Sequence, residues 1–259
     1  MTSAQPQFIS SAANPLLKAL RRLARDSTAY RKQGRVWLEG DHLCRAALAR
    51  GVQPALALFA QGYWDASGHQ WRTAGGQQVV VADALFAGLS ALESPADMAF
   101  VLELPAAAPL QADAPSVILD RVQDAGNVGA ILRSAAAFGF QQVLALKGTA
   151  ALWSPKVLRA GMGAHFGLQL IEGLEPAALD ALAVPLIATS SHQGELLHQA
   201  ALPWPCAWVL GHEGQGVGPE LAARARLTVR IVQPGGEESL NVASAAAICL
   251  HASAAAAAP

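Results

Sequence analysis

Three separated segments in the second half of the 259-residue sequence combine polar side chains with glycines, each directly after an apolar run. The first runs from Leu119 to Ala135. Within it, Asn127 stands where a helix is expected to begin, so an N-capping role alone would explain it. Arg133 follows six residues later on an otherwise apolar helix, where a guanidinium needs an anionic partner or an opening to solvent. Its forked donors suit a phosphate or a carboxylate.

The second segment, from Leu210 to Glu220, places four glycines in the eight residues 211–218, around Glu213 as the one carboxylate of that loop. Backbone without side chains can approach a ligand closely. The spacing is neither the GxGxxG of a dinucleotide site nor a P-loop, and it lacks the second histidine of an HExxH zinc helix. The segment alone therefore indicates only a ligand-binding loop with one acidic group.

The third segment, from Ile231 to Ala243, again runs from a strand through a glycine and proline turn into a helix. Ser239 and Asn241 both stand at the start of that helix. Capping accounts for one of these side chains and does not readily explain both. One of them is thus a candidate for contact with a ligand.

The elements that must position these segments alternate regularly from residue 116 onward. Alternating strands and helices predict a parallel sheet covered on both faces, whose ligands lie at the carboxyl ends of the strands. The predicted strands are Val117–Leu119, Val143–Leu146, Leu186–Ala188, Trp208–Leu210 and Val229–Val232. The predicted helices are Val128–Ala137, Lys156–Gly161, Pro176–Ala183, Pro219–Ala225 and Val242–His251.

Residues 1–105 predict a smaller α/β domain, followed by a linker at 106–115 that is rich in proline and alanine, and by a second domain at 116–259. Asn14-Pro15 opens the first helical pattern, with Leu16, Leu20 and Leu23 as its apolar positions. Residues 18–50 hold nine basic and three acidic side chains, a local excess of +6 in a chain of net charge −1. Such an excess suits a polyanion, and a solvated helix face is the equally weighted alternative.

Cysteine usage and hydropathy bound the setting. Cys44, Cys206 and Cys249 form no CxxC pair, so neither a disulfide framework nor a zinc site is expected, and a reduced, cytoplasmic setting is. The N-terminus lacks the apolar core of a signal peptide. The uncharged tail from Ser239 to Pro259 is interpreted as a buried helix with a frayed alanine end, because polar residues interrupt it. No metal and no membrane association are expected.

Taken in series, the three segments resemble the motifs of the SpoU/TrmH branch of the SPOUT methyltransferases. The matching residues are Asn127/Gly129/Arg133, Gly211/Glu213/Gly214/Gly216 and Ser239/Leu240/Asn241/Val242. The N-terminal part is similar to the RNA substrate-binding domain often fused to this branch. The resemblance implies a C-terminal parallel α/β domain with a deep trefoil knot, which binds S-adenosylmethionine and pairs as a homodimer.

The same resemblance implies the roles of individual residues. The catalytic set would be Asn127, Arg133, Glu213, Ser239 and Asn241. The cofactor contacts, mostly through the backbone, would be Thr189, Gly211, Gly216, Ile231, Gly236 and Leu240. The RNA contacts of the first domain would be Lys18, Arg21, Arg22, Arg31, Lys32 and Arg35. The chain departs from the family pattern at Ala125-Gly126, where a proline-containing turn is usual, and at His212, where a small polar residue is commoner.

The expected reaction is methylation of a ribose 2′-hydroxyl in RNA. Because a guanidinium keeps its proton in proteins and is therefore a poor base, Arg133 is expected to hold a phosphate and stabilise the developing alkoxide. Glu213 would orient Arg133 or its own loop. Large-subunit ribosomal RNA is the favoured substrate and transfer RNA the alternative. A non-catalytic RNA-binding member of the fold and a nucleotide-binding dehydrogenase are the rival interpretations, and the latter lacks its GxGxxG.

Overall fold

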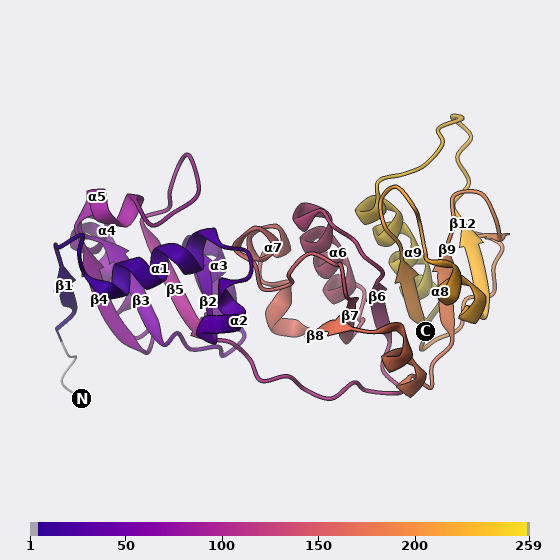
Figure 1. The fold of residues 1–259 in the computed structure, drawn as a ribbon, viewed down its shortest axis with the longest axis horizontal. Helices are drawn as coiled ribbons and strands as arrows, with labels where there is room; N and C mark the ends of the chain where they lie inside the picture. Colours follow the sequence, from indigo (N-terminus) through magenta and orange to yellow (C-terminus); the bar gives the residue numbers. More distant parts are fainter. Residues whose placement is uncertain (1–4, 258–259) are drawn as a thin grey trace. The chain divides into compact units, whose positions relative to one another are not determined.

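The computed structural model describes residues 5–257, which form two compact units. Residues up to Ala106 together with Trp153–Phe166 make the first unit, and Ala107–Leu152 with Gly167 onward make the second. The second unit is therefore interrupted in sequence by a short segment, Trp153–Phe166, that belongs to the first unit. The predicted domains, 1–105 and 116–259, do not include such an exchange. Figure 1 follows the chain through both units.

The first unit is built on a five-stranded mixed sheet in the order β1-β4-β3-β5-β2. Its strands are β1 (Gln7–Ile9), β2 (Arg35–Glu39), β3 (Leu56–Ala60), β4 (Gln77–Val81) and β5 (Met98–Glu103). Its helices are α1 (Pro15–Arg25), α2 (Ala29–Gln33), α3 (Asp41–Ala49), α4 (Gln61–Ser67), η1 (Gly68–Trp71), α5 (Asp83–Ala87) and α7 (Pro155–Gly161), and η2 (Ala164–Gly167) ends at the unit boundary. Buried Trp37, Trp71 and Phe100 fill its core.

Helix α1 begins as the sequence predicts, with the Asn14 side chain accepting a hydrogen bond from Leu16 N at 2.9 Å and Pro15 in the first helical position. Its buried residues are Leu17, Leu20, Leu23 and Ala24, so Leu20 and Leu23 are buried as predicted, and Leu16 is half-buried. Each of these four buried positions lies three, four or seven residues from another of them, which brings them onto one side of the helix.

The second unit is built on a seven-stranded sheet in the order β10-β12-β9-β11-β6-β7-β8, in which every neighbouring pair is parallel. Its strands are β6 (Ser116–Leu119), β7 (Gln142–Leu146), β8 (Gln169–Leu174), β9 (Leu186–Thr189), β10 (Glu195–Leu196), β11 (Ala207–Leu210) and β12 (Leu227–Arg230). Its helices are α6 (Ala125–Ala137), η3 (Pro176–Ala181), α8 (Pro219–Arg224) and α9 (Val242–Ala257). The predicted parallel α/β architecture is confirmed.

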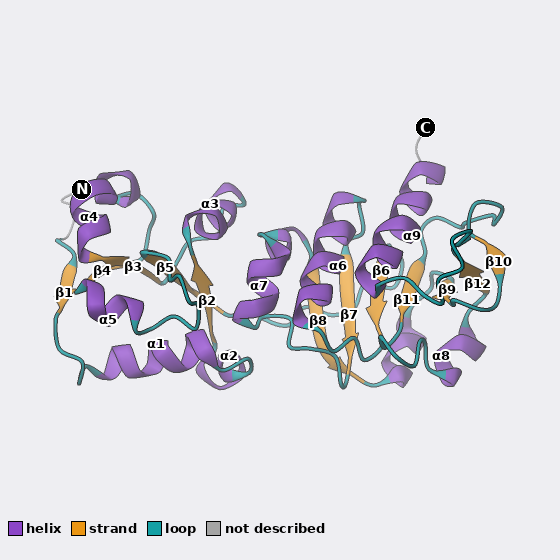
Figure 2. Cartoon of the chain, turned by 90° about the horizontal axis from the view of Figure 1, so that it is seen from above, coloured by secondary structure: helices purple, strands orange, loops and turns teal. Residues whose placement is uncertain are grey.

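Alternate residues of each central strand pack on opposite faces of this sheet. Ile118, Leu144 and Val209 face Leu179 of η3 and Leu221 of α8. The other face is covered by α6 and α9, which pack side by side (Figure 2). Because both faces are covered, the strands are apolar throughout their length. Strands β8 and β10 were not predicted, and the 176–183 helix is a 3-10 helix.

Helix α9 is joined to the sheet by a buried hydrogen bond. Trp208 Nε1 of β11 donates to Ser253 Oγ at 2.9 Å, and both residues are at most 1% exposed. Within the predicted uncharged tail, Val242–Ala257 is thus a helix packed against the sheet, and residues 258–259 lie outside the described residues. No helix among the described residues has the length and apolarity needed to cross a membrane.

We expect Ser253→Ala to destabilise the second unit, because it leaves the buried indole N–H of Trp208 without its acceptor. The loss should be about 1–3 kcal/mol in the free energy of unfolding, measured by urea denaturation. Ser244→Ala, at an exposed position of the same helix, is the matched control and should change stability by less than about 0.5 kcal/mol. Equal losses in the two variants would contradict the assignment.

Candidate functional site

The three predicted segments follow the ends of β6, β11 and β12, with Asn127 and Arg133 on α6 and Glu213, Ser239 and Asn241 in the loops that lead to α8 and α9. Parallel strands place their carboxyl ends at one edge of the sheet, so these loops share that edge. The order β12-β9-β11-β6 puts the four relevant strands next to one another. This is the position at which ligands of open parallel sheets bind.

Asn127 lies in the first turn of α6 and is not its N-cap, which corrects the expected capping role. Helix α6 begins at Ala125, three residues earlier than predicted, and Asp124 is its cap. The Asp124 carboxylate accepts a hydrogen bond from Asn127 N at 2.8 Å. Because a cap already serves the first turn, the amide side chain of Asn127 is available for other contacts.

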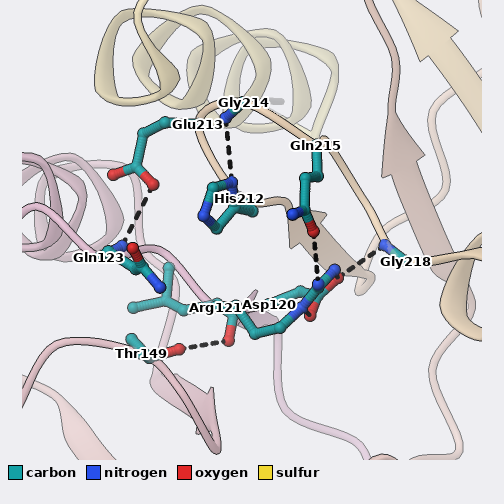
Figure 3. Close-up of polar contacts among 10 residues, drawn as sticks. Asp120, Arg121, Gln123, Thr149, His212, Glu213, Gly214, Gln215 and Gly218 are labelled. Carbon is teal, nitrogen blue, oxygen red and sulfur yellow. Dashed lines mark hydrogen bonds and ion pairs between the residues drawn. The ribbon is translucent and has the colours of Figure 1, made fainter.

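Glu213 fastens the glycine-rich loop to the loop between β6 and α6. Its carboxylate accepts hydrogen bonds from Gln123 N at 3.2 Å, Asp124 N at 3.0 Å and Asn127 Nδ2 at 3.2 Å. Figure 3 shows the contact with Gln123. Burial raises the pKa of the Glu213 carboxyl, but these donors and its own backbone N–H outweigh it and lower the pKa. Of the two expected roles, Glu213 has the one of orienting its loop.

Asn241 joins the third segment to the first. Its Nδ2 donates to Asn127 Oδ1 at 2.9 Å, while its Oδ1 accepts from Ala243 N at 2.9 Å and Ser244 N at 3.2 Å. Asn241 therefore caps α9 and holds Asn127 at the same time. Glu213, Asn127 and Asn241 form one hydrogen-bonded chain across three loops, although 114 residues separate the two asparagines.

Ser239 and Arg133 are not part of this chain of hydrogen bonds. Both side chains are exposed. Arg133 lies on the solvent side of α6, and no hydrogen bond or ion pair to it is found among residues 5–257. Of the two possibilities set out for a guanidinium on an apolar helix, the opening to solvent is the one observed.

The predicted cofactor residues follow the ends of β9, β11 and β12. Thr189 ends β9, and its Oγ1 donates to Val209 O at 3.1 Å. A Cβ on Gly211 would lie 2.1 Å from Gly216 C and Val217 N, so only glycine fits where this loop folds back on itself. Gly216 and Gly236 have positive φ angles of 68° and 78°. Ile231 is half-buried and Leu240 is 39% exposed.

His212, one of the two departures from the family pattern, has a local role. Its Nδ1 accepts a hydrogen bond from Gly214 N at 3.0 Å, and its backbone forms a bridge with Gly216 (Figure 3). The imidazole therefore stiffens the glycine-rich loop from inside.

Asp120 is a positioning residue that the sequence did not single out. Only 4% of it is exposed. Its carboxylate accepts from Arg121 Nε at 2.7 Å and Arg121 Nη2 at 3.1 Å, and from Gly218 N at 2.7 Å (Figure 3). Glu213 of the glycine-rich loop accepts from the backbone between β6 and α6, and Asp120 at the end of β6 accepts from the backbone of the glycine-rich loop. The two loops are thus fastened reciprocally at two points.

Burial raises the pKa of Asp120, but the hydrogen bonds from Arg121 and Gly218 outweigh it, so the pKa lies below its ordinary value. A carboxyl with a lowered folded-state pKa contributes stability above its unfolded pKa and loses that contribution as the pH falls through the folded value. The signal in the sequence was an acidic residue directly after an apolar strand, which has many other uses.

We expect Asp120→Asn to lower the free energy of unfolding by about 1–2 kcal/mol at pH 7, since Arg121 is partly solvated. The difference from the parent protein should shrink as the pH falls below about 4, where the carboxyl of the unfolded chain takes up a proton, and it should be lost as the pH falls through the lower pKa of the folded carboxyl. Urea denaturation at several pH values measures both. Asp113→Asn, an exposed aspartate of the same unit, is the control. A loss of equal size at every pH would show that the charge is not its source.

Several basic residues of the first unit have structural contacts, and some of them also line a hollow on α1. Arg21 Nε donates to Gly88 O at 3.1 Å, and Arg25 donates to Gly88, Leu89 and Ser90 carbonyl oxygens, so both hold the turn after α5. Arg35 pairs with Glu103 and Arg31 contacts the Tyr30 hydroxyl. A hollow of about 420 Å³ on α1 is lined by Lys18, Arg21, Arg22, Arg25 and Asp26.

Known proteins are similar to this chain over the sequence that carries this site. The SpoU rRNA methylase family matches residues 114–251. Over 247 residues the chain is 28% identical to the Bacillus subtilis 23S rRNA (guanosine(2553)-2′-O)-methyltransferase RlmP, covering 94% of this chain and 97% of that protein. It is 30% identical over 265 residues to an uncharacterised tRNA/rRNA methyltransferase of Synechocystis, covering 94% and 92%.

Solved structures agree over almost the whole chain. A crystal structure of an RNA 2′-O-ribose methyltransferase is 31% identical, with a TM-score of 0.79, covering 95% of this chain and 98% of that one. A TrmH-family structure from Porphyromonas gingivalis is 29% identical, with a TM-score of 0.80, covering 94% and 98%. The matched residues include all three motifs at the carboxyl edge of the sheet. This chain belongs to the SpoU rRNA methylase family, and the resemblance drawn from its motifs is confirmed.

Proposed function

We propose that this protein transfers a methyl group from S-adenosylmethionine to a ribose 2′-hydroxyl in RNA. The observation that carries the proposal is the hydrogen-bonded chain Glu213–Asn127–Asn241, which joins the three family motifs at one edge of the sheet. The relatives named for 2′-O-methylation support the reaction type. Family members have also been solved with S-adenosylmethionine bound, at 22% and 24% identity, and these support the fold that holds it.

The loops after β11 and β12 fit such a cofactor. Gly211 lets the loop fold back on itself, and Gly216 has open space where a side chain would stand. In the loop after β12, Gln233 Oε1 is buried and has no hydrogen-bond donor among the described residues. A buried acceptor without a donor is costly, and S-adenosylmethionine carries amino groups that could donate to it. Gly211, Gly216, Ile231, Gly236, Leu240 and Thr189 are the residues we propose to hold the cofactor.

When bound, the cofactor supplies a methyl group on a positively charged sulfur, which is already a good electrophile. The remaining task is to position the 2′-hydroxyl in line with that methyl and to weaken its O–H bond. Asn127 is held at both ends of its amide, by Glu213 and by Asn241, so it can present a fixed polar group to the nucleotide. Ser239, exposed on the loop before α9, is proposed as a further contact.

Arg133 is proposed to hold an RNA phosphate and to stabilise the alkoxide that develops on the ribose oxygen. Its guanidinium is exposed and makes no hydrogen bond or ion pair with residues 5–257, so no carboxylate of the described chain competes with the RNA. A cation placed beside the developing negative charge lowers the barrier through electrostatic stabilisation of the transition state.

We propose that the protein works as a homodimer paired through the face formed by α6 and α9. These two helices pack together, and Ile248 of α9 is 42% exposed on the surface of the unit. A large apolar side chain beside the exposed Arg133 helix suits a contact between two copies, which would bring Arg133 to the partner's site. The deep trefoil knot stays a prediction of the family resemblance.

The basic segment of the first unit is proposed to bind the RNA. Lys18, Arg22 and Lys32 are exposed and suit phosphate contacts, although Arg22 also lies 3.8 Å from the Asp26 carboxylate. Arg21, Arg31 and Arg35 also carry structural hydrogen bonds or ion pairs. Large-subunit ribosomal RNA is the proposed substrate, supported by the 23S specificity of the Bacillus relative, and transfer RNA is the alternative. Among the described residues no group of three or more His, Cys, Asp or Glu side chains could hold a metal ion. We propose that the protein acts in the cytoplasm.

Arg133→Ala should reduce methyl transfer to RNA by about 100- to 1,000-fold while S-adenosylmethionine still binds. The reason is that the guanidinium acts on the ribose and the phosphate, and the cofactor loops do not involve it. Tritium transfer into RNA and titration calorimetry measure the two properties. Arg226→Ala, which removes an exposed arginine elsewhere in the unit, serves as control. Near-normal turnover in R133A would refute the role.

Removal of the gene should abolish one 2′-O-methyl group in large-subunit ribosomal RNA of the host. Mapping of ribose methylation across total RNA, with and without the protein, tests this directly. Complementation by the parent gene should restore the modification, and complementation by R133A should not. Loss of a site in transfer RNA would overturn the ribosomal assignment, and an unchanged map would overturn the proposed function.

A further inference from the structure

A hollow of about 370 Å³ lies at the carboxyl edge of β6, β7 and β8, and neither Asn127 nor Asn241 lines it. It is lined by the ends of these three strands and by the first turn of α8. Neither the family motifs nor the proposed cofactor residues include its lining, apart from the glycine-rich loop that ends at Gly218. We refer to it as the Arg121–Glu220 pocket.

The walls of this pocket are fixed by hydrogen bonds. Arg224 of α8 donates to Pro176 O at 2.8 Å and to Asp180 Oδ1 at 2.5 Å, which ties η3 to α8. Lys147 N donates to Leu174 O at 3.0 Å, and the Lys147 ammonium pairs with Glu175. The Gly218 N–H is held by Asp120. The pocket is therefore preformed, as ligand sites usually are.

Its lining is apolar inside and charged at the rim. Leu146 and Leu221 are at most 4% exposed and form the floor with Leu174 and two prolines. Arg121 and Lys147 stand at the rim against three carboxylates, Asp120, Glu175 and Glu220. A formal charge of −1 disfavours a phosphate. An apolar floor with both donors and acceptors around it suits a flat, neutral ring with polar edges, and a nucleobase has this chemistry.

Arg121 is placed at this rim at a conformational cost. Its φ angle is 61°, in the left-handed region that favours glycine. The Asp120 carboxylate holds its Nε and Nη2, and its Nη1 donates to Gln215 Oε1 at 3.0 Å. Non-glycine residues in this region are concentrated where function requires them. The aliphatic part of Arg121 also packs against Gly148, where a Cβ would lie 3.2 Å from Arg121 Cγ.

We propose that the Arg121–Glu220 pocket receives an unpaired base of the RNA substrate and favours guanine over the other three bases. The Glu220 carboxylate is 64% exposed, and its one ion pair among the described residues is a 3.9 Å contact with Arg224. A carboxylate accepts two parallel N–H groups, and guanine alone presents such a pair, N1–H and N2–H, on its pairing edge. Arg121 and Lys147 are donors suited to guanine O6 and N7. This inference rests on the proposed function, because it supplies the specificity of that reaction.

The test uses the full chain and four RNA heptamers that carry guanine, adenine, cytosine or uracil between two runs of three uridines. Fluorescence anisotropy gives the affinity of each heptamer for the parent protein, for Glu220→Gln and for Glu195→Gln, an exposed glutamate on β10. We expect the guanine heptamer to bind most tightly to the parent protein. In E220Q the preference for guanine should fall about tenfold, and in E195Q it should be unchanged.

Equal binding of all four heptamers by the parent protein, or an unchanged guanine preference in E220Q, overturns the inference. Guanosine monophosphate binding as tightly as the guanine heptamer also overturns it, because the pocket would then be a site for a free nucleotide. Thermal melting of E220Q alongside E195Q verifies the fold. Titration of the parent protein with S-adenosylmethionine separates the two proposals: cofactor binding without base preference overturns the pocket alone, and absence of cofactor binding overturns the proposed function.

Discussion

The candidate site depends on one carboxylate that accepts backbone hydrogen bonds across two loops. Glu213 stands on a loop whose four glycines give it little conformational preference of its own. Its contacts to Gln123 N, Asp124 N and the Asn127 amide fix that loop against the start of α6. A charged acceptor for several N–H groups is a strong interaction, and here it holds both partners at once. Asn127 is oriented by Glu213 on one side of its amide and by Asn241, the cap of α9, on the other.

Asp120 complements this contact from the opposite direction. It is buried in the sheet edge and donates no hydrogen bond, so its carboxylate can serve only as an acceptor for Arg121 and Gly218. Glu213 fastens the start of the glycine-rich loop, and Asp120 of the β6 end fastens its other end through Gly218 N. The loop is thus held on both sides of its flexible centre. Glycine provides the close approach of Gly211 to Gly216, and the two carboxylates restore the rigidity that glycine removes.

The sequence predicted the parallel sheet and the grouping of its motifs because both follow from periodicity. Strands such as Trp208–Leu210 are apolar runs between polar turns, and their carboxyl ends must meet. The cap of α6 was misplaced because Asp124 and Asn127 are both good N-caps, and only the hydrogen bond from Asn127 N to the Asp124 carboxylate shows which of them serves. Helix α7 has an ordinary helical pattern, and nothing local to Pro155–Gly161 indicates that it packs with β2 in the first unit.

The charges of the first unit show the same limit of sequence reasoning. An arginine that lines a basic helix and an arginine that holds a turn look alike in the sequence. Arg25 makes three hydrogen bonds to carbonyl oxygens of residues 88–90, more than 60 positions away, and Arg21 makes one. These guanidinium groups donate hydrogen bonds to the carbonyl oxygens directly after α5, and both arginines also line the hollow on α1. A basic segment can therefore stabilise the fold and attract RNA at the same time. An arginine that donates a hydrogen bond to a carbonyl group keeps its positive charge, and that charge still acts on RNA at longer range.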